Sequence, residues 1–179
     1  MTIPNILTLI RIALIPVTAY MFYIDNITAA VIIFILACLT DIADGYIARH
    51  FNMVTDLGKV LDPLADKGMQ ITVLFSMAAR SFIPWAVVAV IICKELLQLA
   101  GGAHLYSANV IISANWYGKM STVVISICVV IILLFHNMLS PTLLVISQWL
   151  PVVFAGIALL GYIRVFIKLK KAGNRRADK

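Results

Sequence analysis

Residues 41–49 read Asp41-Ile-Ala-Asp44-Gly45-Tyr-Ile-Ala48-Arg49, and residues 58–66 read Gly58-Lys-Val-Leu-Asp62-Pro-Leu-Ala-Asp66. These two segments hold half of the eight Asp and Glu residues in the chain, and mostly hydrophobic sequence flanks them. An ionised carboxylate near a bilayer is costly unless it is paired, hydrated or bound to a metal. Clustered carboxylates also repel one another. Their oxygen atoms are the hard ligands that divalent cations prefer.

The spacing of the aspartates indicates that they converge. Asp41 precedes Asp44 by three positions, and Asp62 precedes Asp66 by four. On helices each pair projects from one face about one turn apart. If the two helix ends meet, the four carboxylates surround one point.

The residues between the aspartates fit a phosphate-handling site. Gly45 and Gly58 lack side chains, so backbone or ligand can approach closely there. Arg49 carries a forked cation whose geometry suits phosphate. Carboxylates, metal and arginine around a small space are the parts of a phosphoryl-transfer or phosphodiester-forming site.

Composition places this site in a membrane protein. The chain of 179 residues is 63% hydrophobic and 12% charged, whereas soluble domains have about 25% charged residues. We therefore predict an all-α polytopic membrane protein, folded as a single domain over 1–179. A spanning helix needs about 20 mostly apolar residues. Six stretches fit that length: 6–24, 29–49, 57–79, 82–104, 121–135 (extending back toward 111) and 143–168.

Basic residues predict the orientation of these six transmembrane helices. Most Lys and Arg lie near the joint after the second stretch, near the joint before the fifth, or at the C-terminus, whereas the opposite side offers Arg80. Both termini, a basic tail at about 169–179 and the aspartates are therefore expected at the cytoplasmic face of the cell membrane. The net charge of +6 suits contact with anionic membrane lipids. No nucleic acid partner is expected, because basic and aromatic residues are not interleaved.

The pattern D-x2-D-G-x2-A-R-x8-G-x3-D-x3-D resembles the signature of the CDP-alcohol phosphotransferases, and this chain matches it at every fixed position. The resemblance implies that Asp41, Asp44 and Asp62 hold a pair of divalent ions, Mg2+ or Mn2+. Asp66 would complete this shell and act as general base on the acceptor hydroxyl. Gly45, Arg49 and Gly58 would accommodate the cytidine and its phosphates.

The N-terminus extends this resemblance. Ile3-Pro4-Asn5-Ile6-Leu7-Thr8-Leu9-Ile10-Arg11 is similar to the opening of phosphatidylglycerophosphate synthases and of the related cardiolipin synthases. By that resemblance Asn5 and Thr8 are nucleotide-side contacts. Arg11 lies at a depth where an unpaired cation is costly, so we expect it to pair with an acid or a bound phosphate.

Two further segments suggest the acceptor. Lys94-Glu95 resembles an Arg-Glu pair of phosphatidylglycerophosphate synthases, and Gly118-Lys119 resembles a Gly-Lys pair of the same enzymes. Arg11, Lys94 and Lys119 are therefore candidate acceptor-binding residues. A mutual or interhelical ion pair at Lys94 and Glu95 is an equal alternative.

These resemblances imply an enzyme that transfers the phosphatidyl group of CDP-diacylglycerol to glycerol 3-phosphate, releasing CMP. Phosphatidylglycerol as acceptor, which would make a cardiolipin synthase, stays open, and so do serine and inositol phosphate. A cation or proton transporter that uses the aspartates is the non-enzymatic alternative. The family resemblance also implies a homodimer.

Overall fold

A computed structural model describes residues 3–51, 56–107 and 116–177 of the chain. For residues 3, 48–49, 56–57, 59–60, 99–107, 116–117, 119, 162 and 165–177 it describes the backbone alone.

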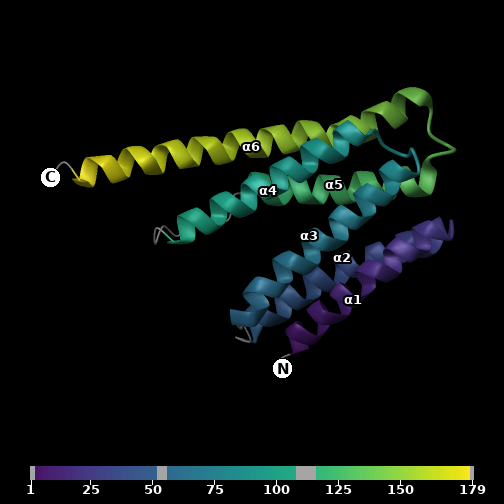
Figure 1. Ribbon diagram of the computed structural model, residues 1–179, viewed down its shortest axis with the longest axis horizontal. Helices are drawn as coiled ribbons and strands as arrows, with labels where there is room; N and C mark the ends of the chain where they lie inside the picture. Colours follow the sequence, from purple (N-terminus) through teal and green to yellow (C-terminus); the bar gives the residue numbers. More distant parts are fainter. Residues whose placement is uncertain (1–2, 52–55, 108–115, 178–179) are drawn as a thin grey trace. The chain divides into compact units, whose positions relative to one another are not determined.

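Six helices make up the described structure (Figure 1). They are α1 Ile3–Tyr23, α2 Ile27–His50, α3 Asp56–Ala79, α4 Trp85–Ser107, α5 Trp116–Phe135 and α6 Pro141–Ala177. The described ranges contain no strand. The predicted all-α class and the positions of the six apolar stretches are therefore confirmed. The sixth helix is longer than expected, because it continues through the basic tail as far as Ala177.

Two of the helices end in the same hydrogen-bonded motif. After α1, Asn26 N–H bonds the Met21 carbonyl at 2.9 Å and Asp25 N–H bonds the Phe22 carbonyl at 3.2 Å. After α3, the equivalent bonds run from Phe82 to Met77 and from Ser81 to Ala78. These bonds define a Schellman motif, in which one residue takes the left-handed conformation. Asp25 and Ser81 hold that position, with φ of 63° and 61°. The motif explains why α4 begins at Trp85 and not at the expected 82.

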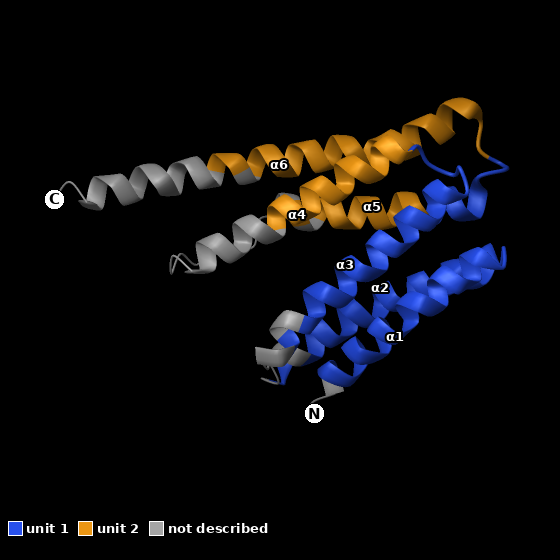
Figure 2. Cartoon of the chain, viewed as in Figure 1, with its two compact units in different colours: residues 1–84, 130–138 blue, residues 85–129, 139–179 orange. Residues whose placement is uncertain are grey.

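The chain divides into two compact units (Figure 2). The first comprises residues 1–84 and 130–138, and the second comprises residues 85–129 and 139–179. In the first unit α1 packs against both α2 and α3, and α2 also contacts α3. In the second unit α4 packs against α6. The single domain expected over 1–179 stays a prediction.

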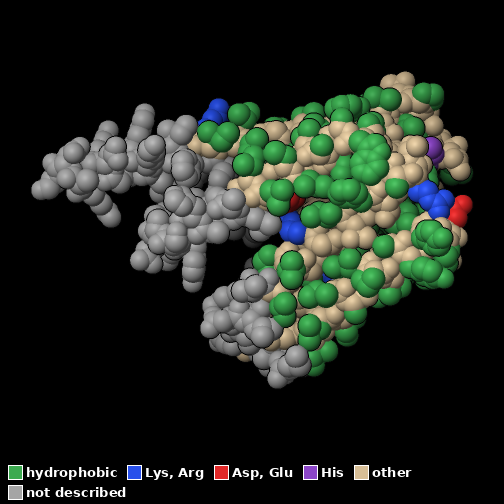
Figure 3. Space-filling view, in the orientation of Figure 1, with side chains coloured by type: hydrophobic (Ala, Val, Ile, Leu, Met, Phe, Trp, Pro, Cys, Tyr) green, Lys and Arg blue, Asp and Glu red, His purple; other side chains and the backbone are tan. Residues whose placement is uncertain are grey.

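The outward-facing side chains are largely apolar. Hydrophobic side chains cover much of the visible described surface, and charged ones are few (Figure 3). Large apolar residues are exposed along α1, α2 and α6, including Ile10, Leu39 and Leu160. Among the described residues three helices contain stretches long and apolar enough to cross a membrane: Pro4–Tyr23, Ile27–Ile47 and Pro141–Gly161. A shorter apolar stretch is Met120–Phe135. Exposed apolar surface on this scale marks a membrane-integral protein.

Candidate metal and phosphoryl-transfer site

The centre of the candidate site is the buried guanidinium of Arg11, which α1 carries into the first unit. Its Nη1 donates to Asp41 Oδ1 and its Nη2 donates to Asp44 Oδ2. The Arg11 side chain is 1% exposed, and the side chains of Asp41 and Asp44 are 42% and 4% exposed. Because Asp41 and Asp44 lie about one turn apart on α2, the planar guanidinium reaches both carboxylates with separate nitrogen atoms. Of the two partners expected for Arg11, the acidic one is confirmed.

A second polar contact joins α1 to α3. Thr8 Oγ1 lies 2.5 Å from Asp62 Oδ1 and 3.0 Å from the carbonyl oxygen of Pro4. A hydroxyl has one proton, so Thr8 donates to one of these acceptors at a time. The Thr8 side chain is fully buried, which makes the charged acceptor the more stabilising choice. Thr8 thus restrains the rotamer of Asp62.

Three of the four predicted metal ligands therefore gather where α1, α2 and α3 meet. The charges of Asp41 and Asp62 act unfavourably on the ionised Asp44, and that of Arg11 acts favourably. Asp66 has a different environment: its side chain is 35% exposed, and the Lys67 ammonium lies 3.6 Å away. Within the described ranges, no three acidic, His or Cys side chains are grouped closely enough to hold one ion. Arg11, which bridges Asp41 and Asp44, supplies the positive charge instead.

The chemistry of this cluster nevertheless fits a hard divalent ion. Its ligand atoms are all carboxylate or hydroxyl oxygens, the donors that Mg2+ and Mn2+ prefer. Asp41, whose side chain is 42% exposed, is more accessible to an ion than Asp44, which is 4% exposed. An ion would share Asp41 and Asp44 with the guanidinium or replace it there.

The other residues predicted to contact the CDP group differ in their burial. Asn5 is 7% exposed and Gly58 is also buried, whereas Gly45 is half-buried. Asn5 precedes Thr8 by about one helical turn, so both belong to the same end of α1. The side chain of Arg49 lies outside the described residues.

A close approach of α1 to α3 lies immediately beyond the cluster. A Cβ at Gly68 would come within 2.8 Å of Ile15 Cδ1, so any larger residue would push this side chain aside. The neighbouring Met69 accepts a weak hydrogen bond from Thr18 Oγ1 through its sulfur, at 3.5 Å. These contacts hold the face of α3 that carries Gly68 and Met69 against α1.

The predicted acceptor residues of the second unit form an internal pair. Lys94 Nζ lies 2.6 Å from Glu95 Oε1, and the two side chains are 3% and 2% exposed. The alternative of a mutual ion pair is therefore confirmed, and acceptor binding by Lys94 stays a prediction. The side chain of Lys119 is outside the described residues. Its neighbour Gly118 is buried, and a Cβ there would lie 3.1 Å from Gln98 Nε2.

The structure also places two residues that sequence reasoning missed. Gln70 on α3 is 4% exposed. The signal for Gln70 in the sequence is its position, because it is a polar residue in an apolar stretch, one helical turn after Asp66. Arg80 lies at the end of α3, where Nη1 donates to Asp25 Oδ1 at 2.6 Å and Nη2 donates to the carbonyls of Phe22 and Tyr23. In the sequence, Arg80 contributed only to the predicted orientation of the helices in the membrane.

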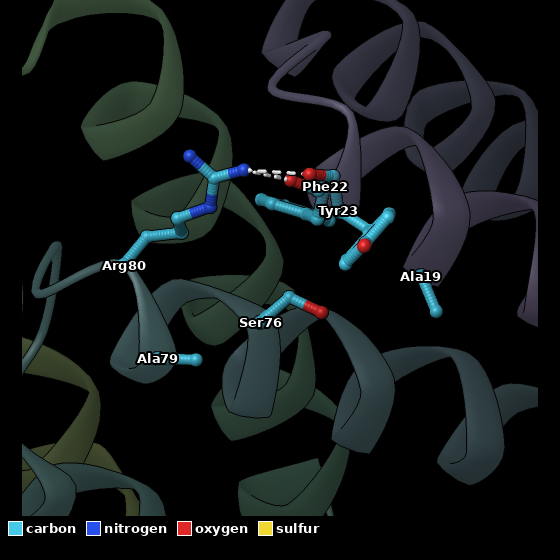
Figure 4. Close-up of a pocket in the computed structure, with 6 residues that line it drawn as sticks. All are labelled: Ala19, Phe22, Tyr23, Ser76, Ala79 and Arg80. Atoms are coloured by element: carbon cyan, nitrogen blue, oxygen red, sulfur yellow. Dashed lines mark hydrogen bonds between the residues drawn. The ribbon is translucent and has the colours of Figure 1, made fainter.

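Arg80 closes one side of a cavity in the first unit (Figure 4). The cavity has a volume of about 430 Å³ and is lined by Ala19, Phe22, Tyr23, Ser76, Ala79 and Arg80. These residues lie toward the C-terminal ends of α1 and α3, whereas Thr8 and Asp62 lie toward the N-terminal ends. The cavity is therefore separate from the acidic cluster.

Comparison with known protein families agrees with the motif. A family model described as CDP-alcohol phosphatidyltransferase matches residues 1–159. A Rickettsia bellii protein named CDP-diacylglycerol–glycerol-3-phosphate 3-phosphatidyltransferase is 37% identical over 123 residues, which cover 67% of this chain and 68% of the relative. A Bacillus subtilis protein of the same name is 36% identical over 151 residues, covering 76% of this chain and 78% of the relative.

A third relative carries a different name. The Schizosaccharomyces pombe cardiolipin synthase (CMP-forming) / mitochondrial hydrolase fusion protein is 38% identical over 104 residues. The match covers 58% of this chain and 18% of that longer protein.

Proposed function

Because the chain belongs to the CDP-alcohol phosphatidyltransferase family, we propose that it transfers the phosphatidyl group of CDP-diacylglycerol to glycerol 3-phosphate. The products are phosphatidylglycerol phosphate and CMP. The observation that carries this proposal is the meeting of Asp41, Asp44 and Asp62 around Arg11 and Thr8. The carboxylates come from both halves of the family signature.

The proposal includes two divalent ions, Mg2+ or Mn2+, held by Asp41, Asp44, Asp62 and Asp66. When bound, they would neutralise the diphosphate of the donor and stabilise the charge on departing CMP. Around them, Asn5, Thr8, Gly45, Arg49 and Gly58 are the proposed contacts of the CDP group. Thr8 has a second role, because its hydroxyl keeps Asp62 oriented before the donor arrives.

The transfer requires one proton to move. The acceptor hydroxyl oxygen forms a bond to the phosphorus of the phosphatidyl group, and the bond from that phosphorus to the CMP oxygen breaks. CMP leaves with the electron pair of the broken bond. Asp66 takes the proton of the attacking hydroxyl, and its 35% exposure leaves the carboxylate accessible to an acceptor.

Glycerol 3-phosphate is the favoured acceptor for two reasons. The Rickettsia and Bacillus relatives, which are matched over two thirds or more of their length, carry its name. A dianionic acceptor also requires positive charge, and Arg11, Lys94 and Lys119 are the proposed sources. Phosphatidylglycerol is the second candidate, because the fission yeast relative is named as a cardiolipin synthase.

The orientation in the membrane belongs to the same proposal. Six spanning helices, a homodimer and cytoplasmic termini would place the aspartates at the cytoplasmic face of the cell membrane, where water-soluble glycerol 3-phosphate is available. Cysteine labelling in an otherwise cysteine-free variant tests the orientation. A probe at Asn174 is expected to react after cells are permeabilised, and reaction from outside intact cells would overturn this topology.

An acceptor panel tests the reaction itself. Purified protein is given CDP-diacylglycerol labelled in the phosphatidyl group, a divalent metal and one acceptor at a time. Label is expected in phosphatidylglycerol phosphate when glycerol 3-phosphate is present. Transfer to phosphatidylglycerol would identify a cardiolipin synthase. Transfer to serine or inositol phosphate would reassign the acceptor, and no CMP release with any acceptor would refute the enzyme.

A further inference from the structure

The side-chain amide of Gln70 is buried and its hydrogen bonds are not satisfied by the described residues. Its side chain is 4% exposed. Neither the amide oxygen nor the amide nitrogen has a hydrogen-bond partner among the described residues. Buried side-chain amides are nearly always hydrogen-bonded, because an unmade bond leaves the full desolvation penalty uncompensated. A polar molecule bound beside Gln70 would provide the missing bonds.

The position of Gln70 along α3 relates it to the acidic cluster. Asp62, Asp66 and Gln70 are spaced four residues apart, so they form one continuous stripe along the helix. Each step of four residues turns the stripe by about 40°. Asp62 lies beside Thr8 of α1, and Met69 of the α1-facing side contacts Thr18. Gln70 is rotated about 100° from Met69, so the stripe turns away from α1 as it continues past Asp66.

Helix geometry also directs Gln70 back toward Asp66. The Cα–Cβ bonds of a helix tilt toward its N-terminus, so a long side chain covers the preceding turn. The turn before Gln70 carries Asp66, the proposed general base for the attacking hydroxyl. A molecule whose hydroxyl meets Asp66 would therefore have its next polar group near the Gln70 amide.

We propose that Gln70 is a positioning residue for the acceptor, and that its amide hydrogen-bonds the hydroxyl of glycerol 3-phosphate that does not attack. This inference rests on the proposed function. A neutral amide has a donor and an acceptor, so it can both donate to a hydroxyl and accept from it. It adds no charge to a site that already holds several carboxylates. The phosphate of the acceptor is left to the basic residues.

The test compares two acceptors that differ by one hydroxyl. Glycerol 3-phosphate is assayed against 3-hydroxypropyl phosphate, which keeps the attacking hydroxyl and the phosphate but lacks the middle hydroxyl. A site built to bond a hydroxyl discriminates against the analogue, because its polar group is left unpaired. We expect wild-type kcat/KM to favour glycerol 3-phosphate by about tenfold or more.

The deciding variant is Gln70→Met, which keeps the length of the side chain and removes the amide. Its preference for glycerol 3-phosphate is expected to fall to about one, mainly through a higher acceptor KM, while the KM for CDP-diacylglycerol is unchanged. Gln148→Met is the matched control, because it makes the same change at a half-buried position of α6. The Gln148→Met control is expected to keep the wild-type preference for glycerol 3-phosphate over 3-hydroxypropyl phosphate.

The ratio of kcat/KM for the two acceptors distinguishes acceptor positioning by Gln70 from a purely structural role. A destabilised Gln70→Met protein would lose activity with both acceptors, but its preference would stay as in the wild type. That result would overturn the proposal, and so would a wild type that uses both acceptors equally. Gln70→Leu serves as a second apolar variant if the first does not fold. If the wild type releases CMP with neither acceptor, the proposed function fails, and this inference fails with it.

Discussion

The guanidinium of Arg11 and the carboxylate of Asp44 form a buried ion pair between α1 and α2, with side chains 1% and 4% exposed. The same guanidinium also bonds Asp41. Arg11 therefore compensates two acidic charges that α2 places beside α1. Without it, the buried Asp44 would lack a cationic partner among the described residues.

The first prediction follows from this pair. Replacing Arg11 by Met leaves Asp44 uncompensated, and breaking a buried pair from one side typically lowers the free energy of unfolding by about 3–5 kcal/mol. We expect a lower unfolding midpoint for Arg11→Met in chelator, measured in detergent. Added Mn2+ should restore part of this loss, because a cation at Asp41 and Asp44 replaces the lost charge. Arg11→Lys, which keeps the charge without the fork, should be intermediate. An unchanged midpoint for Arg11→Met would contradict the assignment.

The second prediction separates two buried threonines of α1. Thr8→Val removes the hydroxyl that restrains Asp62, a hydrogen bond to a charged group worth about 1.5–3 kcal/mol. Its loss should lower both stability and kcat. Thr18→Val is the matched control, because the Thr18 hydroxyl has only uncharged acceptors and donates to either the carbonyl of Leu14 or the sulfur of Met69. It should cost less stability and leave kcat near the wild-type value. Equal losses of kcat in both variants would deny Thr8 a special role.

The third prediction concerns metal removal. The cluster offers carboxylate and hydroxyl oxygens as ligands, which favours a hard divalent ion. CMP release is expected to stop in excess EDTA and to resume when Mg2+ or Mn2+ is restored. Full turnover in EDTA would exclude the proposed metal site.

The fourth prediction assigns different roles to two aspartates of α3. Asp62 is proposed to act through metal binding, so raising the metal concentration should partly restore Asp62→Asn. Asp66 is also proposed to accept a proton, so Asp66→Asn should bind donor and metal but turn over very slowly. Donor binding and single-turnover rates are measured for both variants across a metal titration. The same degree of rescue in both would refute this division of roles.

The fifth prediction concerns a contact remote from the acidic cluster. Arg80 bonds the last carbonyls of α1 and pairs with Asp25. Arg80→Met should lower the free energy of unfolding by about 1–3 kcal/mol through these lost bonds. Asp25→Asn should cost less than about 1 kcal/mol, because the ion pair is exposed and Asn also tolerates a positive φ.

Catalysis should be insensitive to Arg80. Arg80 follows Asp62 by 18 residues, which is about 27 Å along a helix. The kcat of Arg80→Met is therefore expected near the wild-type value once folded protein is counted. A large fall in kcat with normal stability would instead connect this end of α3 to the reaction.

Much of the fold could be predicted from the sequence because its signals are local. Apolar runs bounded by turn residues located all six helices. The helix ends were less predictable, because Schellman motifs usually have Gly at the left-handed position. Asp25 and Ser81 take that conformation here, and Arg80 supports the end of α1 from a distant part of the sequence.

The candidate site was predictable to the extent that it depends on spacing. The intervals between the aspartates indicated shared helix faces, and Asp41, Asp44 and Asp62 do gather. The partner of Arg11 was left open, because an acid and a phosphate satisfy the same charge. The spacing of Gln70 from Asp66 is visible in the sequence, but its burial and its unmet hydrogen bonds depend on tertiary packing.

Phosphatidyl transfer itself tests the central claim most directly. Purified protein is incubated with CDP-diacylglycerol and Mg2+ or Mn2+, and both products are quantified with and without glycerol 3-phosphate. We predict that CMP and phosphatidylglycerol phosphate appear in equal amounts, that both require glycerol 3-phosphate, and that Asp44→Asn abolishes both. Absence of CMP release from the folded wild-type protein, together with cation flux through it in vesicles, would contradict the enzyme and favour a transporter.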